Sequence, residues 1–193
     1  MNMLFCWGFF FGEPLEKLVI MNEEAVSRTI TRLCHEIIEN NGDCRDIVFI
    51  GIHNRGVPIS KRIQIKVNEH LGINLDRGSL DIAFHRDDYR QRLIVPEIKG
   101  TNISFSLDGK VVVLVDDVLY SGRTVRAALE ELNSFGRASK VQLAVLVDRG
   151  HRELPIKPDY VGKNIPTHEG EHVEVSLIET DEIDSVFLIR NKV

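Results

Sequence analysis

The 193-residue sequence has few cysteines, and they do not stand at metal-binding or redox spacing. Cys6, Cys34 and Cys44 are three in number, and no two of them form a C-x-x-C pair. An odd number of scattered cysteines is typical of reduced thiols. The sequence therefore predicts a cytoplasmic protein without a disulfide framework or a zinc site.

Long apolar runs and an excess of positive charge are also missing. No stretch approaches the roughly 20 apolar residues of a membrane-spanning helix, so no membrane partner is expected. The formal net charge of −5 excludes a general polyanion binder, and any nucleic-acid site must be a local basic patch. With 43% hydrophobic residues, a chain of this length fits one globular domain with one core.

The first seventeen residues differ from the rest. Residues 1–12 (MNMLFCWGFFFG) hold the only tryptophan and four of the nine phenylalanines. A signal peptide would need a basic start and a small-residue cleavage site, and this segment has neither. A mis-assigned start, a disordered leader and an added strand or oligomer contact all remain open. We favour a dispensable extension over residues 1–17, followed by a single domain over residues 18–193.

Residues 111–124 (VVVLVDDVLYSGRT) form the pattern around which the domain is organised. Five consecutive apolar residues lead into two aspartates, a small hydroxyl-bearing turn follows, and a helical segment comes next. A run that is apolar on both faces suits a central strand of a parallel sheet, and ligands bind at the carboxyl ends of such strands. The turn then opens a helix, whose N-terminal N–H groups favour a phosphate.

The residues of this turn suit a phosphorylated ribose. Ser121 and Thr124 offer hydroxyl groups, Gly122 lets the backbone approach closely, and Asp116 and Asp117 can accept from vicinal sugar hydroxyls. Adjacent aspartates alone usually mark only a solvated strand end. The full string is more specific than the aspartates alone. It also differs from a P-loop and from a dinucleotide-binding G-x-G-x-x-G, because it lacks the glycine spacing of both. It resembles the phosphoribosyl-diphosphate (PRPP) motif of type I phosphoribosyltransferases.

A second strand, loop and helix precede this motif. The apolar strand 47–50 is followed by residues 51–56 (GIHNRG), and Val57-Pro58 opens a helix that we expect to reach about Leu71. Backbone N–H groups and Arg55 offer a place for a second anion, such as a pyrophosphate. Alone this would be an ordinary strand-to-helix turn, but beside a PRPP motif the functional interpretation is the better one.

Periodicity and capping signals predict the remaining elements. Asn22 is a good N-cap for a helix to about Asn40, and Gly136 suits the end of the helix that begins at Thr124. The expected elements are a strand at 18–21, helices at 22–40 and 124–135, a strand at 79–84, a strand at 141–147, and antiparallel strands at 173–178 and 185–190.

Residues 18–193 resemble the bifunctional pyrimidine operon regulator and uracil phosphoribosyltransferase family, PyrR. Besides the PRPP string, the resemblance rests on residues 143–155 (LAVLVDRGHRELP) and 162–167 (GKNIPT), with shorter matches at 31–36, 51–56 and 86–88. It implies an α/β protein with the type I phosphoribosyltransferase fold. In this fold a central, mostly parallel sheet is flanked by helices, with a small hood mainly over 148–170 and a flexible lid loop at about 85–103.

The resemblance implies transfer of the phosphoribosyl group of PRPP to uracil, giving UMP and pyrophosphate. Mg²⁺ is implied as a cofactor that the substrate holds, with no metal site in the protein itself. The implied catalytic residues are Arg55, Arg86, Asp116 and Asp117. The implied PRPP-binding residues are His53, Asn54, Gly56, Val118, Leu119, Tyr120, Ser121, Gly122, Arg123 and Thr124, and uracil binding, largely through backbone groups, falls to Asp148, Arg149, Tyr160 and Val161.

The resemblance also implies an RNA-binding transcription attenuator of pyrimidine genes that senses UMP or UTP in the same pocket. A regulator without catalysis and an enzyme without RNA control both remain alternatives, and a homodimer or higher oligomer is expected. A third alternative is a purine phosphoribosyltransferase, but that enzyme would need a different hood, so the hood sequence argues against it. His85 replaces the tyrosine that usually precedes Arg-Asp-Asp in this family, which affects only the lid. The candidate RNA-binding residues are Thr31, Arg32, His35, Arg149, Arg152 and Lys163.

Overall fold

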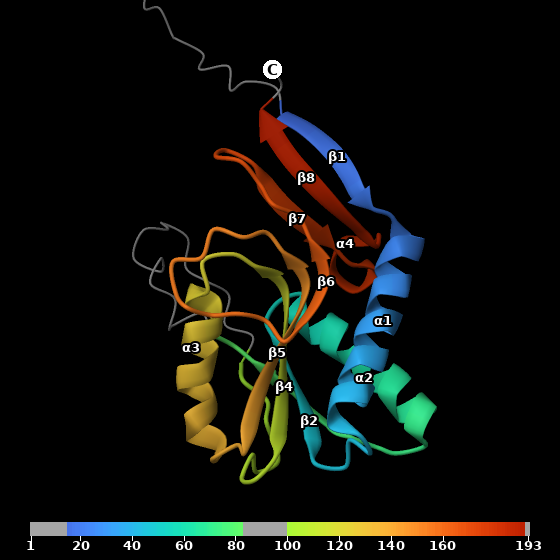
Figure 1. Cartoon of the computed structure of the whole chain (residues 1–193), viewed down its shortest axis with the longest axis vertical. Helices are drawn as coiled ribbons and strands as arrows, with labels where there is room; N and C mark the ends of the chain where they lie inside the picture. Colours follow the sequence, from blue (N-terminus) through green and yellow to red (C-terminus); the bar gives the residue numbers. More distant parts are fainter. Residues whose placement is uncertain (1–14, 83–99, 192–193) are drawn as a thin grey trace, which may run out of the picture.

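The computed structural model describes residues 15–82 and 100–191 (Figure 1). A parallel sheet has the strand order β3-β2-β4-β5-β6, and a smaller antiparallel sheet has the order β1-β8-β7. The elements are β1 (Leu15–Met21), α1 (Glu23–Asn41), β2 (Ile47–Ile52), α2 (Gly56–Leu71), β3 (Asp76–Leu80), β4 (Val111–Leu119), α3 (Arg123–Leu132), β5 (Lys140–Asp148), β6 (Tyr160–Asn164), β7 (His172–Ser176), α4 (Ile178–Asp181) and β8 (Ser185–Asn191).

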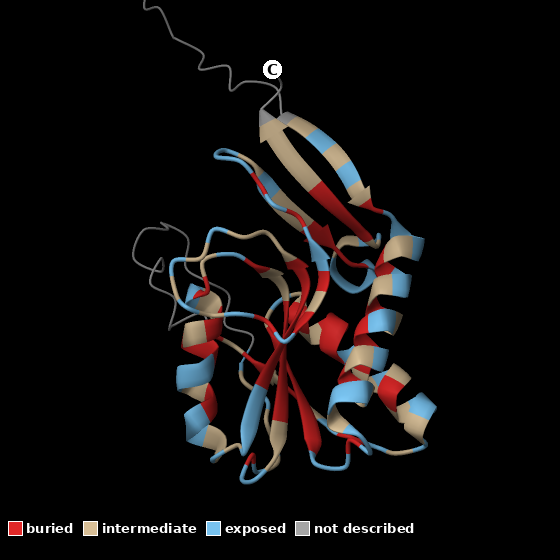
Figure 2. Cartoon of the chain, viewed as in Figure 1, coloured by how far each residue is buried: buried red, intermediate tan, exposed pale blue. Residues whose placement is uncertain are grey.

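The strand β4 lies at the centre of the parallel sheet, as its apolar run predicts. Alternate residues of β4 enter two separate cores: Val113 packs with α1 and α2, whereas Val112 packs with α3. The two layers of helices cover the buried strands on either side (Figures 1 and 2). Because β2 pairs with β4 in parallel, with Gly51 opposite Val115, the loops that follow these two strands emerge side by side.

Helix α1 agrees closely with its prediction. The Asn22 side chain accepts a hydrogen bond of 3.0 Å from the Ala25 amide, and the helix ends at Asn41, one residue beyond the expected position. Val26, Ile30, Leu33 and Ile37 at helical spacing are buried, and Ile38 is partly buried. The N-cap therefore fixes where the chain turns from β1 into the helix.

The small sheet joins the two ends of the folded chain. Strand β1 pairs antiparallel with β8, beginning with Leu15 opposite Asn191. Strand β7 pairs antiparallel with the other edge of β8, which confirms the predicted pairing of these two strands. Strand β1 begins at Leu15, so residues 15–17 of the expected extension belong to this sheet. The rest of the expected extension lies outside the described residues.

Three predicted elements have other boundaries in the structure. Strand β7 covers His172–Ser176 instead of 173–178, and Ile178 begins α4. Strand β3 covers Asp76–Leu80, so it begins before the predicted residue 79, because parallel pairing with β2 sets its register despite its polar residues; residues 83–84 lie outside the described residues. Helix α3 ends at Leu132, and Asn133–Phe135 continue as a 3-10 turn before Gly136 at a φ of +130°. Most of the expected lid, including Arg86 and His85, lies outside the described residues.

Two of the three cysteines lie in the core of the described structure. Cys34 and Cys44 are buried and free, and burial raises the pKa of both thiols. Cys6 lies outside the described residues. Across residues 15–82 and 100–191, the structure contains no helix of the length and apolar character that crossing a membrane requires.

Candidate active site

A cavity of about 490 Å³ opens at the carboxyl ends of β2 and β4. It brings together the two loops that the sequence singled out, and the first turn of α3 closes one side. The lining also includes Arg149, which was predicted, and Glu153, which was not. The lining residues are His53, Asn54, Arg55, Asp116, Asp117, Val118, Leu119, Tyr120, Ser121, Gly122, Arg123, Thr124, Arg149 and Glu153.

The two aspartates at the end of β4 are held by the backbone that follows them. The Asp117 amide donates to Oδ1 of Asp116 at 2.9 Å, and the Val118 amide donates to Oδ1 of Asp117 at 2.9 Å. Asp116 is buried, and Asp117 is partly exposed to the cavity. Because both carboxylates are oriented by short local hydrogen bonds, they form a preorganised acidic pair at one wall.

The loop 120–124 ends at the N-terminus of α3. Gly122 is the N-cap residue and has a φ of +92°, a left-handed conformation that favours glycine. Gly122 has no side chain to cap this end of the ten-residue helix, and the Arg123 amide makes a long hydrogen bond of 3.4 Å to the Ser121 hydroxyl. The N-terminus of α3 borders the cavity, and N–H groups at such a helix end suit a bound phosphate.

The start of α2 sits tightly against β4. A Cβ atom on Gly56 would lie 2.3 Å from the carbonyl oxygen of Val115, so only glycine allows this approach. The close packing brings the loop 53–55 next to Asp116, and the peptide between His53 and Asn54 is cis. Gly56 therefore contributes to the cavity through the position of the backbone.

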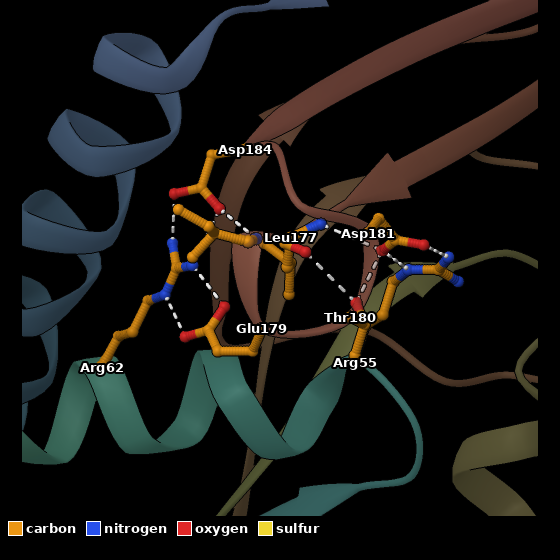
Figure 3. A network of polar contacts seen from close by, with 8 residues as sticks. Arg55, Arg62, Leu177, Glu179, Thr180, Asp181 and Asp184 are labelled. Carbon is orange, nitrogen blue, oxygen red and sulfur yellow. Dashed lines mark hydrogen bonds and ion pairs between the residues drawn. The ribbon is translucent and has the colours of Figure 1, made fainter.

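The guanidinium of Arg55 is paired with a carboxylate that the sequence did not single out. Asp181 of α4 accepts from Nε of Arg55 at 3.0 Å and from Nη2 at 2.8 Å (Figure 3). The hydrogen bond to Asp181 raises the pKa of Arg55, and the same contact holds the pKa of Asp181 well below its usual range. The only sequence signal for Asp181 was its place in an acidic turn.

Glu153, a second acid that the sequence did not single out, links the loop 120–124 to the hood. The guanidinium of Arg123 donates to Glu153 at 2.7 Å, and the Glu153 amide donates to the Ser121 carbonyl at 3.0 Å. Arg149 stacks over the Tyr120 ring with its guanidinium carbon 3.9 Å from the ring centroid. Glu153 and Arg149 thus both hold the hood segment against the loop 120–124.

The predicted uracil-binding residues occupy different positions. Among them, only Arg149 lines the cavity. Asp148 accepts from Arg152 at 2.6 Å, whereas Tyr160 is buried and its hydroxyl accepts from the Asn41 amide group at 3.0 Å. The side chain of Tyr160 therefore lies beneath α1, and only its main chain can contribute to the hood. Val161 already uses its carbonyl to accept from Arg32.

The predicted RNA-binding residues fall into two groups. Thr31, Arg32 and His35 lie on α1, and Lys163 on β6 reaches the Ile20 carbonyl just before α1 at 3.3 Å. Arg32 joins the two elements by donating to the carbonyls of Val161 and Gly162. The other two residues belong to the hood. Arg149 donates to Thr167 and to the Glu171 carbonyl, and Arg152 donates to Asp148 and to the Tyr120 carbonyl.

The acidic groups suit a magnesium ion that the substrate carries. Within residues 15–82 and 100–191, no cluster of three or more His, Cys, Asp or Glu side chains can hold a metal. Asp116 and Asp117 are the two adjacent carboxylates at the cavity wall. Mg²⁺ often binds through one or two carboxylates, several waters and substrate phosphates, and this donor set fits that pattern.

Comparison with known proteins confirms the fold and identifies the domain family. Residues 20–180 match the family model of the phosphoribosyl transferase domain. The structure is similar to the hypoxanthine phosphoribosyltransferase of Trypanosoma cruzi, with a TM-score of 0.70 and 15% identity over 91% of this chain and 97% of that chain. A hypoxanthine-guanine phosphoribosyltransferase from Bacillus anthracis gives 0.63 and 16%, over 90% and 98% of the two chains. Fold and motif together define a phosphoribosyltransferase.

Closer relatives identify the family. The bifunctional protein PyrR of Clostridioides difficile is 52% identical over 172 residues, which cover 89% of this chain and 97% of that protein. The bifunctional protein PyrR of Deinococcus radiodurans is 50% identical over 172 residues, covering 89% and 94%. The chain belongs to the bifunctional PyrR family.

Proposed function

We propose that the chain transfers the phosphoribosyl group of PRPP to N1 of uracil and releases pyrophosphate. The cavity at the ends of β2 and β4 is the main support for this proposal, because three parts of its lining match the three parts of PRPP. The acidic pair suits the ribose hydroxyls, the N-terminus of α3 suits the 5-phosphate, and Arg55 suits the pyrophosphate. Membership of the PyrR family supports uracil as the acceptor.

The reaction needs charge stabilisation more than covalent chemistry. The bond between C1 of the ribose and the pyrophosphate oxygen breaks, and the oxygen keeps the electron pair. N1 of uracil then bonds to C1 and loses its proton. Asp116 and Asp117 hold the ribose and place negative charge near the cationic sugar, while Arg55 faces the charge on the leaving group. When bound, Mg²⁺ supplies further positive charge there, and the two aspartates are the described residues able to hold it.

The test is uracil-dependent release of pyrophosphate from PRPP in the presence of Mg²⁺. We expect the Asp116→Asn, Asp117→Asn double variant to lose at least about 100-fold in kcat/KM, because preorganised charges at the reacting centre are worth about that much. The matched control is Asp43→Asn, Asp46→Asn. It removes two exposed acids just before β2, at the opposite end of the parallel sheet.

Two results would contradict the proposal. Turnover that survives in the Asp116→Asn, Asp117→Asn variant would remove the acidic pair from the mechanism. Pyrophosphate release that depends on hypoxanthine instead of uracil would reassign the acceptor to a purine.

A second function is binding of the leader RNA of pyrimidine genes, with UMP or UTP in the cavity as the signal. Thr31, Arg32 and His35 on α1 and Lys163 on the neighbouring β6 favour it, because they add basic and polar side chains to an otherwise acidic chain. Basic and polar side chains of this kind recognise the unpaired bases of RNA loops. The bifunctional designation of the relatives supports this role.

The assembly and compartment follow from the same proposals. A homodimer or higher oligomer would present the RNA-binding group more than once, and two copies of a weak contact bind more tightly than one. The cytoplasm is the proposed location for both activities. The free thiols of Cys34 and Cys44 support it.

A further inference from the structure

Arg55 receives its orientation from a part of the chain that lies outside the parallel sheet. It stands at the start of α2, whereas Asp181 belongs to α4, in the connection between β7 and β8 of the small sheet. The two side chains meet in a bidentate pair of 3.0 and 2.8 Å (Figure 3). A planar guanidinium held at two nitrogens by one carboxylate has little rotational freedom left.

Asp181 is itself fixed before any substrate arrives. Its Oδ2 accepts from the Leu177 amide at 3.1 Å and from the Thr180 hydroxyl at 2.6 Å, and its own amide donates to the Leu177 carbonyl. Leu177 is fully buried and anchors the turn in the core. The carboxylate is therefore a rigid acceptor that holds Arg55 in one place.

The pairing leaves one nitrogen of Arg55 for a ligand. Asp181 takes Nε and Nη2, and no hydrogen bond joins Nη1 to any residue within 15–82 or 100–191. Figure 3 shows this third nitrogen outside the network. Arg55 also lines the cavity together with Asp117. We propose that Asp181 is a positioning residue that presents Nη1 of Arg55 to the pyrophosphate of PRPP. This inference rests on the proposed function.

The same turn contains a matched control. Arg62 lies further along α2 and makes a bidentate pair with Asp184 at 2.6 and 2.8 Å, with a further contact to Glu179. This pair also ties α2 to the chain between β7 and β8, but Arg62 does not line the cavity. Loss of Asp184 thus removes an equivalent structural link and leaves Arg55 paired.

The experiment measures the dissociation constant of PRPP with Mg²⁺ by calorimetry without uracil, and KM and kcat with uracil. We expect Asp181→Asn to raise both the dissociation constant and the KM of PRPP about three- to tenfold, the cost of leaving a long side chain to be ordered on binding. The KM of uracil stays unchanged. Asp181→Glu keeps the carboxylate and recovers part of the loss, while Asp184→Asn lowers the melting temperature and changes PRPP binding less than about twofold.

A double-mutant cycle separates positioning from general scaffolding. In an Arg55→Ala background, Asp181→Asn should leave PRPP binding unchanged, because the residue that it positions is gone. Equal losses of PRPP affinity in Asp181→Asn and Asp184→Asn would overturn the inference, and so would a loss that persists without Arg55. If the wild type binds PRPP but does not turn over uracil, the proposed reaction fails, and the binding comparison still decides the role of Asp181.

Discussion

Two arginines of α2 are neutralised by the same short stretch of chain, yet only one of them faces the cavity. Asp181 pairs with Arg55, and Asp184 with Glu179 pairs with Arg62. The hydrogen bond from Arg55 lowers the pKa of Asp181. For Asp184, burial acts to raise the pKa, but hydrogen bonds from Arg62 and the Ile178 amide outweigh it and lower the pKa. These carboxyls therefore stay ionised in the folded state at a pH where unfolded aspartates already bind protons.

The difference between the folded-state and unfolded-state pKa values of these carboxyls predicts how stability responds to acid. The folded-state pKa values of Asp181 and Asp184 lie below their ordinary 3.8, so their contribution is fully present well above that value. As the pH falls through about 4, the unfolded chain binds protons first, and stability is lost until the folded-state pKa values are passed. We expect urea unfolding between pH 7 and 3 to show a smaller decline below pH 4 in an Asp181→Asn, Asp184→Asn variant. Parallel declines in the two proteins would contradict this prediction.

At the scale of elements, β1 is the link between the start of the chain and the small sheet. It pairs with β8 from Leu15 to Met21 with a register shift after Val19. Met21 at its end is buried, and the Ser185 hydroxyl donates to the Met21 carbonyl at 3.0 Å. Arg190 and Glu16 add an ion pair across the ladder. Residues 1–14 lie outside the described residues.

Two truncations test where the domain begins. Removal of residues 1–14 keeps β1, and we expect a melting temperature within about 2 °C of the full chain. Removal of residues 1–21 deletes β1 and the buried Met21, which costs about 3 kcal/mol, or roughly 6–12 °C at this chain length. Thermal unfolding followed by circular dichroism measures both. A large loss from the shorter truncation would give residues 1–14 a structural role.

The elements that the sequence predicted well are those whose signals are local. The apolar run of β4, the glycine turn and the helix that follows occur in one stretch, and Asn22 marks the start of α1 through its own side chain. Strand β3 was misplaced because its start is polar, and only its pairing with β2 makes it a strand. The turn α4 has four residues, too few for a helical period.

At the scale of the whole molecule, charge is distributed unevenly. The chain carries a net charge of −5, yet α1 carries Arg32 and His35, and the neighbouring β6 carries Lys163. An acidic protein that binds RNA through such a group should release few counterions and depend moderately on salt. Specific binding then requires contacts with particular bases in addition to phosphate contacts.

The RNA-binding group can be tested against a matched pair elsewhere. With UMP present and a pyrimidine-gene leader transcript as the probe, we expect His35→Ala, Lys163→Ala to weaken binding at least about tenfold and to lower the salt slope by about one. His172→Ala, Lys140→Ala removes the same residue types from exposed positions on β7 and β5 and should change little. Filter binding at several salt concentrations gives both quantities. Equal weakening in the two variants would indicate non-specific attraction only.

The cavity was predictable to the extent that its residues follow the ends of parallel strands. His53 to Arg55 and Asp116 to Thr124 come together because β2 and β4 are neighbours. Asp181 could not be found in this way, since it lies 126 residues from Arg55 and no local pattern links them. Tyr160 shows the opposite problem: the family resemblance implies that it binds uracil, but its side chain lies in the core.

The pairing of β1 with β8 also sets an order of events during synthesis. Strand β1 leaves the ribosome first, and its partner is among the last segments to be made. Strands β2 to β6 can pair as they emerge, whereas β1 has to wait for the C-terminus, and closing so long a loop carries an entropic cost. Because α4 lies just before β8, Arg55 receives its carboxylate partner only after β2 to β6 have been made. A nascent chain therefore has its acidic pair in place before the arginine opposite it is anchored.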